Sequence, residues 1–198
     1  MLNNTALTSL SLPALTTVTG EVFLGFDNAL TSLSLPALTT VGSNFDVSNM
    51  PALTTVSLPA LKTVGGNLNF INDPELTSVS APMLTSTNEI DIDTDPKLPT
   101  FSLPALTTTA GVLAIKTNAI LTSVSAPLLA TSASVYITSN PALTTLTLSA
   151  LTTVSGAMTV QVNAALRQCV VDAIKAKITT GPTTYTATGN DGMPNTCP

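Results

Sequence analysis

The most concentrated set of chemically versatile side chains is the acidic segment EIDIDTDP at residues 89–96. In an extended strand Asp91 and Asp93 point to the same face, and with Asp95 nearby they offer the oxygen ligands that Ca²⁺ prefers. The segment lacks the glycine and the closing glutamate of the standard calcium-binding loop. We therefore expect no metal, and keep a calcium site at Asp91, Asp93 and Asp95 as the weaker alternative to a solvent-exposed acidic strand.

Other candidates for catalysis are few. The 198 residues include no histidine, so a Ser-His-Asp set is impossible and Cys169 has no histidine as its base. Paired carboxylates for glycoside hydrolysis would need a cleft, which evenly spaced short repeats do not offer. We expect no catalytic residue, no cofactor and no enzymatic activity.

The charge balance excludes two classes of partner. Six Lys and Arg stand against eleven Asp and Glu, a net charge of −5, so the chain has no basic surface for nucleic acid or an anionic membrane. No run of apolar residues approaches the roughly 18 needed for a transmembrane helix, so we expect no membrane insertion.

Threonine doublets recur at a fixed spacing and form a candidate contact surface. The doublets without interruption are Thr16 and Thr17, Thr39 and Thr40, Thr107 and Thr108, and Thr152 and Thr153. One interpretation is structural, with hydroxyls that bond to the backbone at corners of the chain. The other is a regular hydroxyl and methyl lattice that orders water or lies on a crystalline surface. The inward apolar residues on either side of each doublet favour a corner over a flat strand.

An internal repeat determines the elements that must position these side chains. The phrase LTSLSLPALTTV and its variants open at seven positions about 22–23 residues apart: Leu7, Leu30, Leu53, Leu76, Leu98, Leu121 and Leu143. Each copy continues with a looser phrase that alternates as a strand does, and prolines exclude long helices. We therefore predict an all-β solenoid of about seven coils, each with two or three short strands. Its core consists of inward ladders of Leu and Val.

Asparagines near the end of the second phrase indicate a further ladder. Stacked amides in a solenoid satisfy backbone groups at a corner, so we expect an internal structural ladder. Its predicted members are Asn49, Asn72, Asn140 and Asn163, with Asn118 close by.

The two ends of the array differ. Residues 1–165 form the predicted solenoid, which starts in mid-coil, and its open edge could pair with another chain. Residues 166–198 form a predicted cap, with an amphipathic helix over Leu166–Ile178 that turns Val170, Val171, Ile174 and Ile178 inward. We expect a disulfide between Cys169 and Cys197 to close this cap, with two free thiols as the alternative.

The segment LPALTTVGGNLNF at Leu58–Phe70, with the L-x-x-L-x-L opening of the repeat, resembles the leucine-rich repeats of receptor L domains. It is most similar to the versions in bacterial surface or secreted proteins and in fungal cell-wall glycoproteins. The resemblance implies a right-handed β-helix, export to the cell surface or beyond, and a role in recognition or in the cell envelope. It transfers no catalytic residue.

Together these observations predict an extracellular, non-enzymatic recognition, adhesion or cell-envelope module. Its partner would be a cell-surface protein or a glycan, bound by second-phrase positions that vary between copies: Phe23, Asp46, Asn69, Asp91, Ala114, Tyr136 and Thr159. The alternative function is ice binding by the threonine columns.

Overall fold

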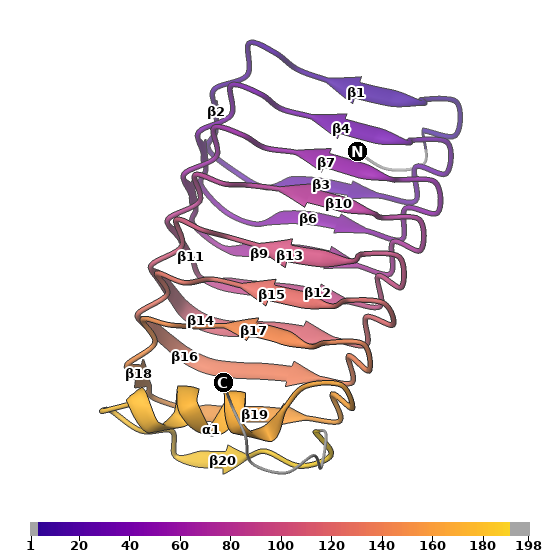
Figure 1. Cartoon of the computed structure of the whole chain (residues 1–198). Coiled ribbons are helices and arrows are strands. Elements are labelled where there is room, and N and C mark those ends of the chain that lie inside the picture. The colour runs from indigo at the N-terminus through magenta and orange to yellow at the C-terminus, as the bar shows by residue number, and fades with distance from the viewer. Residues whose placement is uncertain (1–3, 191–198) are drawn as a thin grey trace.

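The chain winds into a β-solenoid with one short helix at its C-terminal end (Figure 1). The computed structural model describes residues 4–190. Seven coils follow the seven sequence copies, and the cap contributes a further turn, so the solenoid has about eight turns instead of the seven predicted. All the strand pairs are parallel and in register between equivalent repeat positions.

The first side of the solenoid consists of one three-residue strand from each coil, in the L-x-x-L-x-L part of the repeat. The strands are β1 (Ser9–Ser11), β4 (Ser32–Ser34), β7 (Thr55–Ser57), β10 (Ser78–Ser80), β13 (Thr100–Ser102), β15 (Ser123–Ser125) and β17 (Thr145–Thr147). They divide into a four-stranded and a three-stranded sheet, with β10 and β13 in contact at the junction.

The remaining strands form one 13-stranded sheet that turns a corner. Short strands start it: β2 (Thr17–Val18), β5 (Thr40–Val41), β8 (Thr63–Val64), β11 (Ser86–Thr87) and β18 (Thr153–Val154). Longer strands follow on the side opposite the first: β3 (Val22–Gly25), β6 (Phe45–Ser48), β9 (Asn67–Ile71), β12 (Glu89–Asp93) and β19 (Ala157–Gln161). The strands β14 (Thr108–Lys116) and β16 (Thr131–Thr138) continue through the corner.

The predicted apolar ladders form the core. In the second coil Leu30, Leu33, Leu35, Leu38 and Val41 are all at most 2 % exposed. The same repeat positions are buried in the later coils except at Val79, which is partly buried. Each coil contributes a thin layer, and burial of these layers against each other is the main stabilising contribution.

Each coil turns a tight corner just after its second-phrase strand, with one residue in the left-handed region of backbone conformation. These residues have φ between 55° and 61° in the seven coils, and a glycine with φ 69° takes the position in the cap: Phe26, Asn49, Asn72, Thr94, Thr117, Ser139, Val162 and Gly189. Asn and Gly tolerate this conformation, whereas Val and Phe are strained in it.

The next residue belongs to a column that we call the corner ladder, and from Asp27 to Asn163 its side chains are fully buried. Its members are Asn4, Asp27, Met50, Asp73, Asp95, Asn118, Asn140, Asn163 and Asn190. The predicted ladder is therefore right for Asn118, Asn140 and Asn163, which are fully buried. It is wrong for Asn49 and Asn72, which lie one residue earlier at the left-handed position and bond to each other at the surface.

The C-terminal cap closes the stack. Helix α1 (Gln168–Lys177) confirms the predicted helix with slightly shorter bounds, and Val171 and Ile174 are buried as expected. Beyond it β20 (Thr184–Thr186) pairs with β19, and Thr180 forms a bridge to Thr153, which continues the sheet for one turn. The cap is therefore an eighth coil in which a helix stands in place of a strand.

The predicted disulfide cannot be located in the cap. Cys169 lies in the first turn of α1, whereas Cys197 is outside the described residues, so the bond stays a prediction. Within residues 4–190, no helix is long and apolar enough to cross a membrane.

The N-terminal coil leaves its apolar layer partly open. Leu10, Leu15, Val18 and Val22 are only partly buried, and they border a cavity of about 190 Å³. Their equivalents in the next coil are fully buried, because a preceding coil covers them.

Candidate binding faces

The second-phrase strands present the residues that differ most between coils. Strand register stacks the predicted variable positions in one continuous column: Phe23, Asp46, Asn69, Asp91, Ala114, Tyr136 and Thr159, extended into the cap by Thr186. We call this column and its outward neighbours the variable face. A regular scaffold thus places side chains of six types, with the buried methyl group of Ala114 among them, at steps of the parallel-strand spacing of about 4.8 Å.

A small charged cluster lies at the centre of the variable face. The ammonium group of Lys116 is 3.1 Å from a carboxylate oxygen of Asp91 and 3.3 Å from one of Asp93. Burial raises the pKa of Asp91, and the hydrogen bond and charge of Lys116 oppose this shift. Burial and the charge of Asp91 also raise the pKa of Glu89. The cluster has more acids than bases, so the centre of this face is negative.

The structure divides the trio that was weighed as a calcium site. Asp91 and Asp93 point outward and pair with Lys116, whereas Asp95 points inward as a member of the corner ladder. Within the described part of the chain no three acidic, cysteine or histidine side chains gather as metal ligands would. Sequence spacing missed this division because the left-handed Thr94 turns the chain between Asp93 and Asp95.

In three of the four predicted doublets, the hydroxyl of the first threonine donates to the backbone of the preceding coil. The hydroxyl of Thr39 donates to the backbone carbonyl of Thr16 at 2.9 Å, and the hydroxyl of Thr107 donates to that of Thr85 at 3.0 Å. Thr152 makes a longer bond of this kind to Ala130. These contacts favour the structural interpretation for this column.

The second threonine of each doublet lies on the short corner strands. Register aligns Thr17, Thr40, Thr108 and Thr153 in one column with Thr63, Ser86 and Thr131, and the cap adds Thr180. Most of these side chains are half-buried at the corner. The predicted doublets therefore do not form two exposed columns on a plane.

Another hydroxyl surface lies on the first side of the solenoid, which faces the viewer in Figure 1. Each strand there has the pattern Ser/Thr–apolar–Ser/Thr, and within each of its two sheets the two outward residues stack in register with those of the neighbouring strands. We call this surface the hydroxyl face. One column is Ser9, Ser32, Thr55, Ser78, Thr100, Ser123 and Thr145, and the other is Ser11, Ser34, Ser57, Ser80, Ser102, Ser125 and Thr147.

The hydroxyl face differs from the doublet columns in its bonding. All its side chains are exposed or half-buried, and none has a side-chain hydrogen bond within residues 4–190. Neither column contains a charged residue. The sequence carries this face in triplets such as SLS, TVS and TLT, which are less uniform between copies than the threonine doublets.

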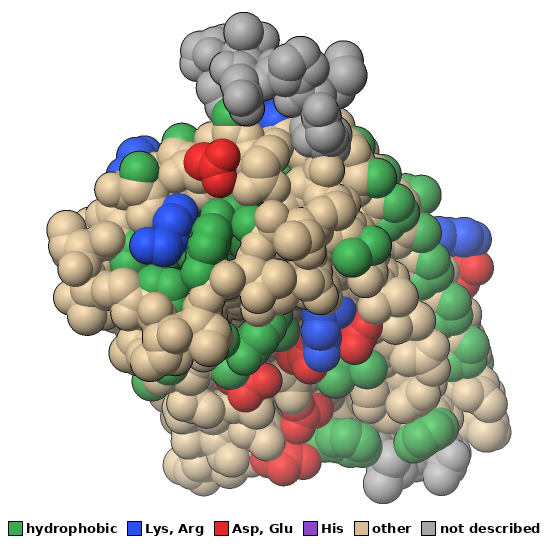
Figure 2. Space-filling model, turned by 90° about the horizontal axis from the view of Figure 1, so that it is seen from below, with side chains coloured by type: hydrophobic (Ala, Val, Ile, Leu, Met, Phe, Trp, Pro, Cys, Tyr) green, Lys and Arg blue, Asp and Glu red, His purple; other side chains and the backbone are tan. Residues whose placement is uncertain are grey.

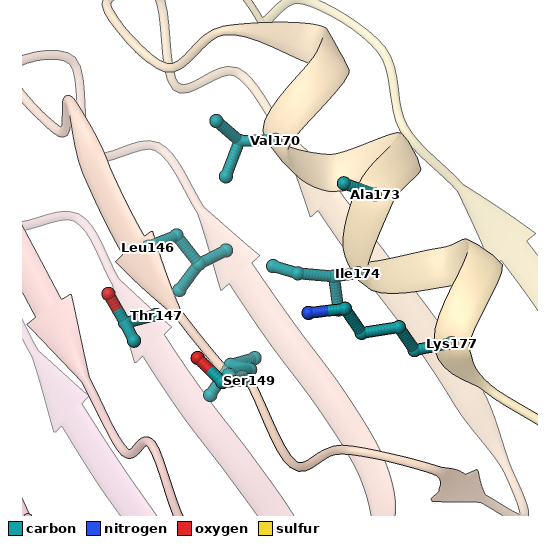
Figure 3. Close-up of a pocket in the computed structure, with 8 residues that line it drawn as sticks. Leu146, Thr147, Ser149, Val170, Ala173, Ile174 and Lys177 are labelled. Atoms are coloured by element: carbon teal, nitrogen blue, oxygen red, sulfur yellow. The ribbon is translucent and has the colours of Figure 1, made fainter. Parts of the chain in front are cut away.

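The surface near the cap offers one open apolar groove. It lies between α1 and β17, has a volume of about 300 Å³, and is lined by Leu146, Val170, Ile174 and the stem of Lys177 among others (Figure 3). Seen from the capped end, charged side chains occur only in small groups on a mostly neutral surface (Figure 2). The groove marks where the helix covers the last strand less completely than another strand would.

Comparison with protein-family models, with curated proteins and with solved structures found no significant match. The resemblance to receptor L-domain repeats therefore stays a prediction, and the geometry establishes the β-solenoid alone.

Proposed function

We propose that this protein is a non-enzymatic recognition or adhesion module that acts outside the cell and binds its partner through the variable face. The single observation that carries the proposal is the in-register column of eight side chains of six residue types on an otherwise repetitive scaffold. A scaffold that only needed to be stiff would not require this variation, because the inward ladders alone provide stiffness.

The chemistry of the variable face suits a polar, uncharged or basic partner. Asn69, Asp91 and Thr159 supply hydrogen-bonding groups, and the half-exposed ring of Tyr136 supplies a stacking surface. The acidic centre around Asp91 repels polyanions. A glycan or a basic patch on a cell-surface protein meets these requirements.

A binding screen tests this proposal. The purified protein is applied to an array of immobilised oligosaccharides and to intact cells, beside the triple variant Asn69→Ala, Tyr136→Ala and Thr159→Ala. We expect at least a tenfold loss of binding in this variant, equivalent to about 1.4 kcal/mol. The matched control carries Ser34→Ala, Ser57→Ala and Ser125→Ala on the opposite side and should bind normally. Equal binding by both variants, or no binding to either probe by the unchanged protein, would contradict the proposal.

Ice binding is the second candidate, and the hydroxyl face favours it more than the predicted doublets do. Two adjacent columns place hydroxyls about 4.8 Å apart along the solenoid and roughly 6.6 Å apart along each strand. Because these hydroxyls have no partner within residues 4–190, they are available to ordered water. Thr39 and Thr107, by contrast, have already used their donors.

Thermal hysteresis and ice-crystal shaping test the second candidate. If the hydroxyl face binds ice, Ser57→Tyr should abolish faceting, whereas Thr108→Tyr on the corner column should leave most of it. Unshaped ice from the unchanged protein would exclude this function, and equal loss in both variants would reassign it to the corner.

We also propose that a disulfide between Cys169 and Cys197 closes the cap. Support comes from their position as the only two cysteines of the chain, both within the predicted cap. Such a bond fits an oxidising compartment, and it agrees with the export implied by the resemblance to receptor L domains.

A further inference from the structure

Three members of the corner ladder are acids: Asp27, Asp73 and Asp95. The last two lie in consecutive coils, just before the coils that have amides. Oδ1 of the Asp and Asn members from Asp27 to Asn163 accepts the backbone N–H of the member one coil earlier. Asp73 accepts from Met50 at 2.8 Å, Asp95 accepts from Asp73 at 2.9 Å, and Asn118 accepts from Asp95 at 2.9 Å. This bond needs only a carbonyl-type oxygen, so an acid and an amide make it equally well.

The second polar atom distinguishes the amides from the acids. In the asparagine members Nδ2 donates to a backbone carbonyl of the preceding coil. These bonds join Asn118 to Ile92 at 3.1 Å, Asn140 to Ile115 at 3.0 Å and Asn163 to Ile137 at 2.8 Å. The ladder therefore needs an acceptor on one side of each member and a donor on the other.

Asp73 and Asp95 have an oxygen where the amides have this donor. Both Oδ2 atoms are buried and have no hydrogen-bond partner. Strand register makes the carbonyls of Val47 and Phe70 the equivalents of the amide acceptors for Asp73 and Asp95. An ionised carboxylate cannot donate to a carbonyl, but a protonated carboxyl group can. Protonated aspartic acid thus has the bonding pattern of asparagine.

The surroundings of these two acids oppose ionisation. Both side chains are fully buried, and neither forms an ion pair with a cation among the described residues. Burial raises the pKa of Asp73 to about 7, against the backbone donors that favour the charged form. Burial raises the pKa of Asp95 to about 8, and the negative charge of Asp73 adds to this shift.

The charged groups on the neighbouring strands and corners do not compensate. Asp91 and Asp93 on β12 add negative charge near Asp95. Lys116 on β14 is held on the outer surface by these two carboxylates. Lys97 forms an ion pair with Glu75, with 2.7 Å between its Nζ and a carboxylate oxygen, and this pair lies on the exposed surface.

We propose that Asp73 and Asp95 form a proton-dependent lock in the corner ladder, in which the protonated side chains donate to the preceding coil and loss of the protons loosens the middle of the solenoid. The direction follows from linkage. A carboxyl group whose pKa is higher in the folded chain than its ordinary 3.8 stabilises the fold, and this contribution is complete at pH values below 3.8. This contribution is lost as the pH rises through about 7 and about 8, so the protein is most stable in mild acid.

Urea unfolding between about pH 4 and about pH 9 tests the lock. In the unchanged protein we expect the unfolding equilibrium constant to rise at least tenfold over this range, because folding raises the pKa of Asp73 to about 7 and that of Asp95 to about 8. The double variant Asp73→Asn and Asp95→Asn should lose most of this rise, whereas Glu21→Gln on the exposed first coil should keep it. The reverse change, Asn140→Asp, should steepen it. An unchanged slope in the double variant would overturn the proposal.

A direct titration covers the case in which a variant does not fold. The ¹³C resonances of the side-chain carboxyl carbons are followed with pH in the unchanged protein. We expect two buried aspartates with midpoints above about pH 6. Midpoints below about pH 5 for all aspartates would overturn the proposal regardless of the variants.

Discussion

The hydroxyl of Thr39 donates a 2.9 Å hydrogen bond to the backbone carbonyl oxygen of Thr16, at the equivalent position one coil earlier. The same carbonyl also accepts the backbone N–H of Thr39 at 2.8 Å. This doubled contact recurs along the solenoid, for example between Thr107 and Thr85. The most regular threonines of the sequence therefore join the coils to each other.

Removing this hydroxyl should lower stability. Thr39→Val keeps the shape of the side chain but loses the donor, so we expect a loss of about 0.5–1.5 kcal/mol in the free energy of unfolding. Urea denaturation measures it. The matched control is Thr55→Val on the hydroxyl face, which should stay within about 0.5 kcal/mol of the unchanged protein. Equal losses in both variants would show that the Thr39 contact contributes nothing specific.

Relieving backbone strain at the last corner should raise stability. Val162 has φ 56° and is 54 % exposed, in the column where two other coils have Asn49 and Asn72. Because a β-branched residue is strained in this region, Val162→Asn should add about 1 kcal/mol to the free energy of unfolding. Thermal and urea unfolding both report the change. Ile120→Asn, at a similarly exposed position outside this column, should bring no such gain.

Closely stacked glycines between the short corner strands and the second-phrase strands should not tolerate a side chain. A Cβ at Gly65 would overlap the carbonyl oxygen of Gly42, whereas a Cβ at Gly20 would meet no atom within 4 Å. We expect Gly65→Ala to destabilise the fold by about 1–3 kcal/mol through displacement of the backbone. Gly20→Ala should be neutral or slightly stabilising, and a comparable loss there would contradict this explanation.

Reduction should weaken the cap if Cys169 and Cys197 are bonded. The loop between them has about 27 residues, for which the entropy of loop closure gives a contribution of about 3–4 kcal/mol. Mass spectrometry of the unreduced protein checks the bond, and unfolding with and without reductant measures its effect. The double variant Cys169→Ser and Cys197→Ser should be insensitive to reductant. Two free thiols in the unreduced protein would refute the prediction.

Much of the scaffold could be predicted because every copy of the repeat has nearly the same pattern of apolar and polar residues. Alternation and leucine spacing indicated which residues turn inward. Buried as predicted are Leu30, Leu33, Leu35, Leu38 and Val41. The amphipathic pattern likewise located α1 and the burial of Val171 and Ile174. These features depend on period and polarity, which are properties of the chain itself.

The candidate faces depended on the three-dimensional path of the chain. One left-handed residue decides that Asp93 points outward and Asp95 inward, and that Asn72 is a surface residue while Asp73 joins the corner ladder. Hydrogen bonding likewise separates Thr39, whose hydroxyl donates to Thr16, from Thr55, whose hydroxyl has no hydrogen-bond partner among residues 4–190.

The sequence by itself determined the solenoid, its period, its inward ladders and its helical cap, because neighbours at a fixed spacing must repeat the same local geometry. Only the tertiary structure decided which polar columns are open to a partner. Stacking places each side chain against a residue about 22–23 positions away, and that contact determines whether a hydroxyl or carboxyl group is already bonded, buried or free for water.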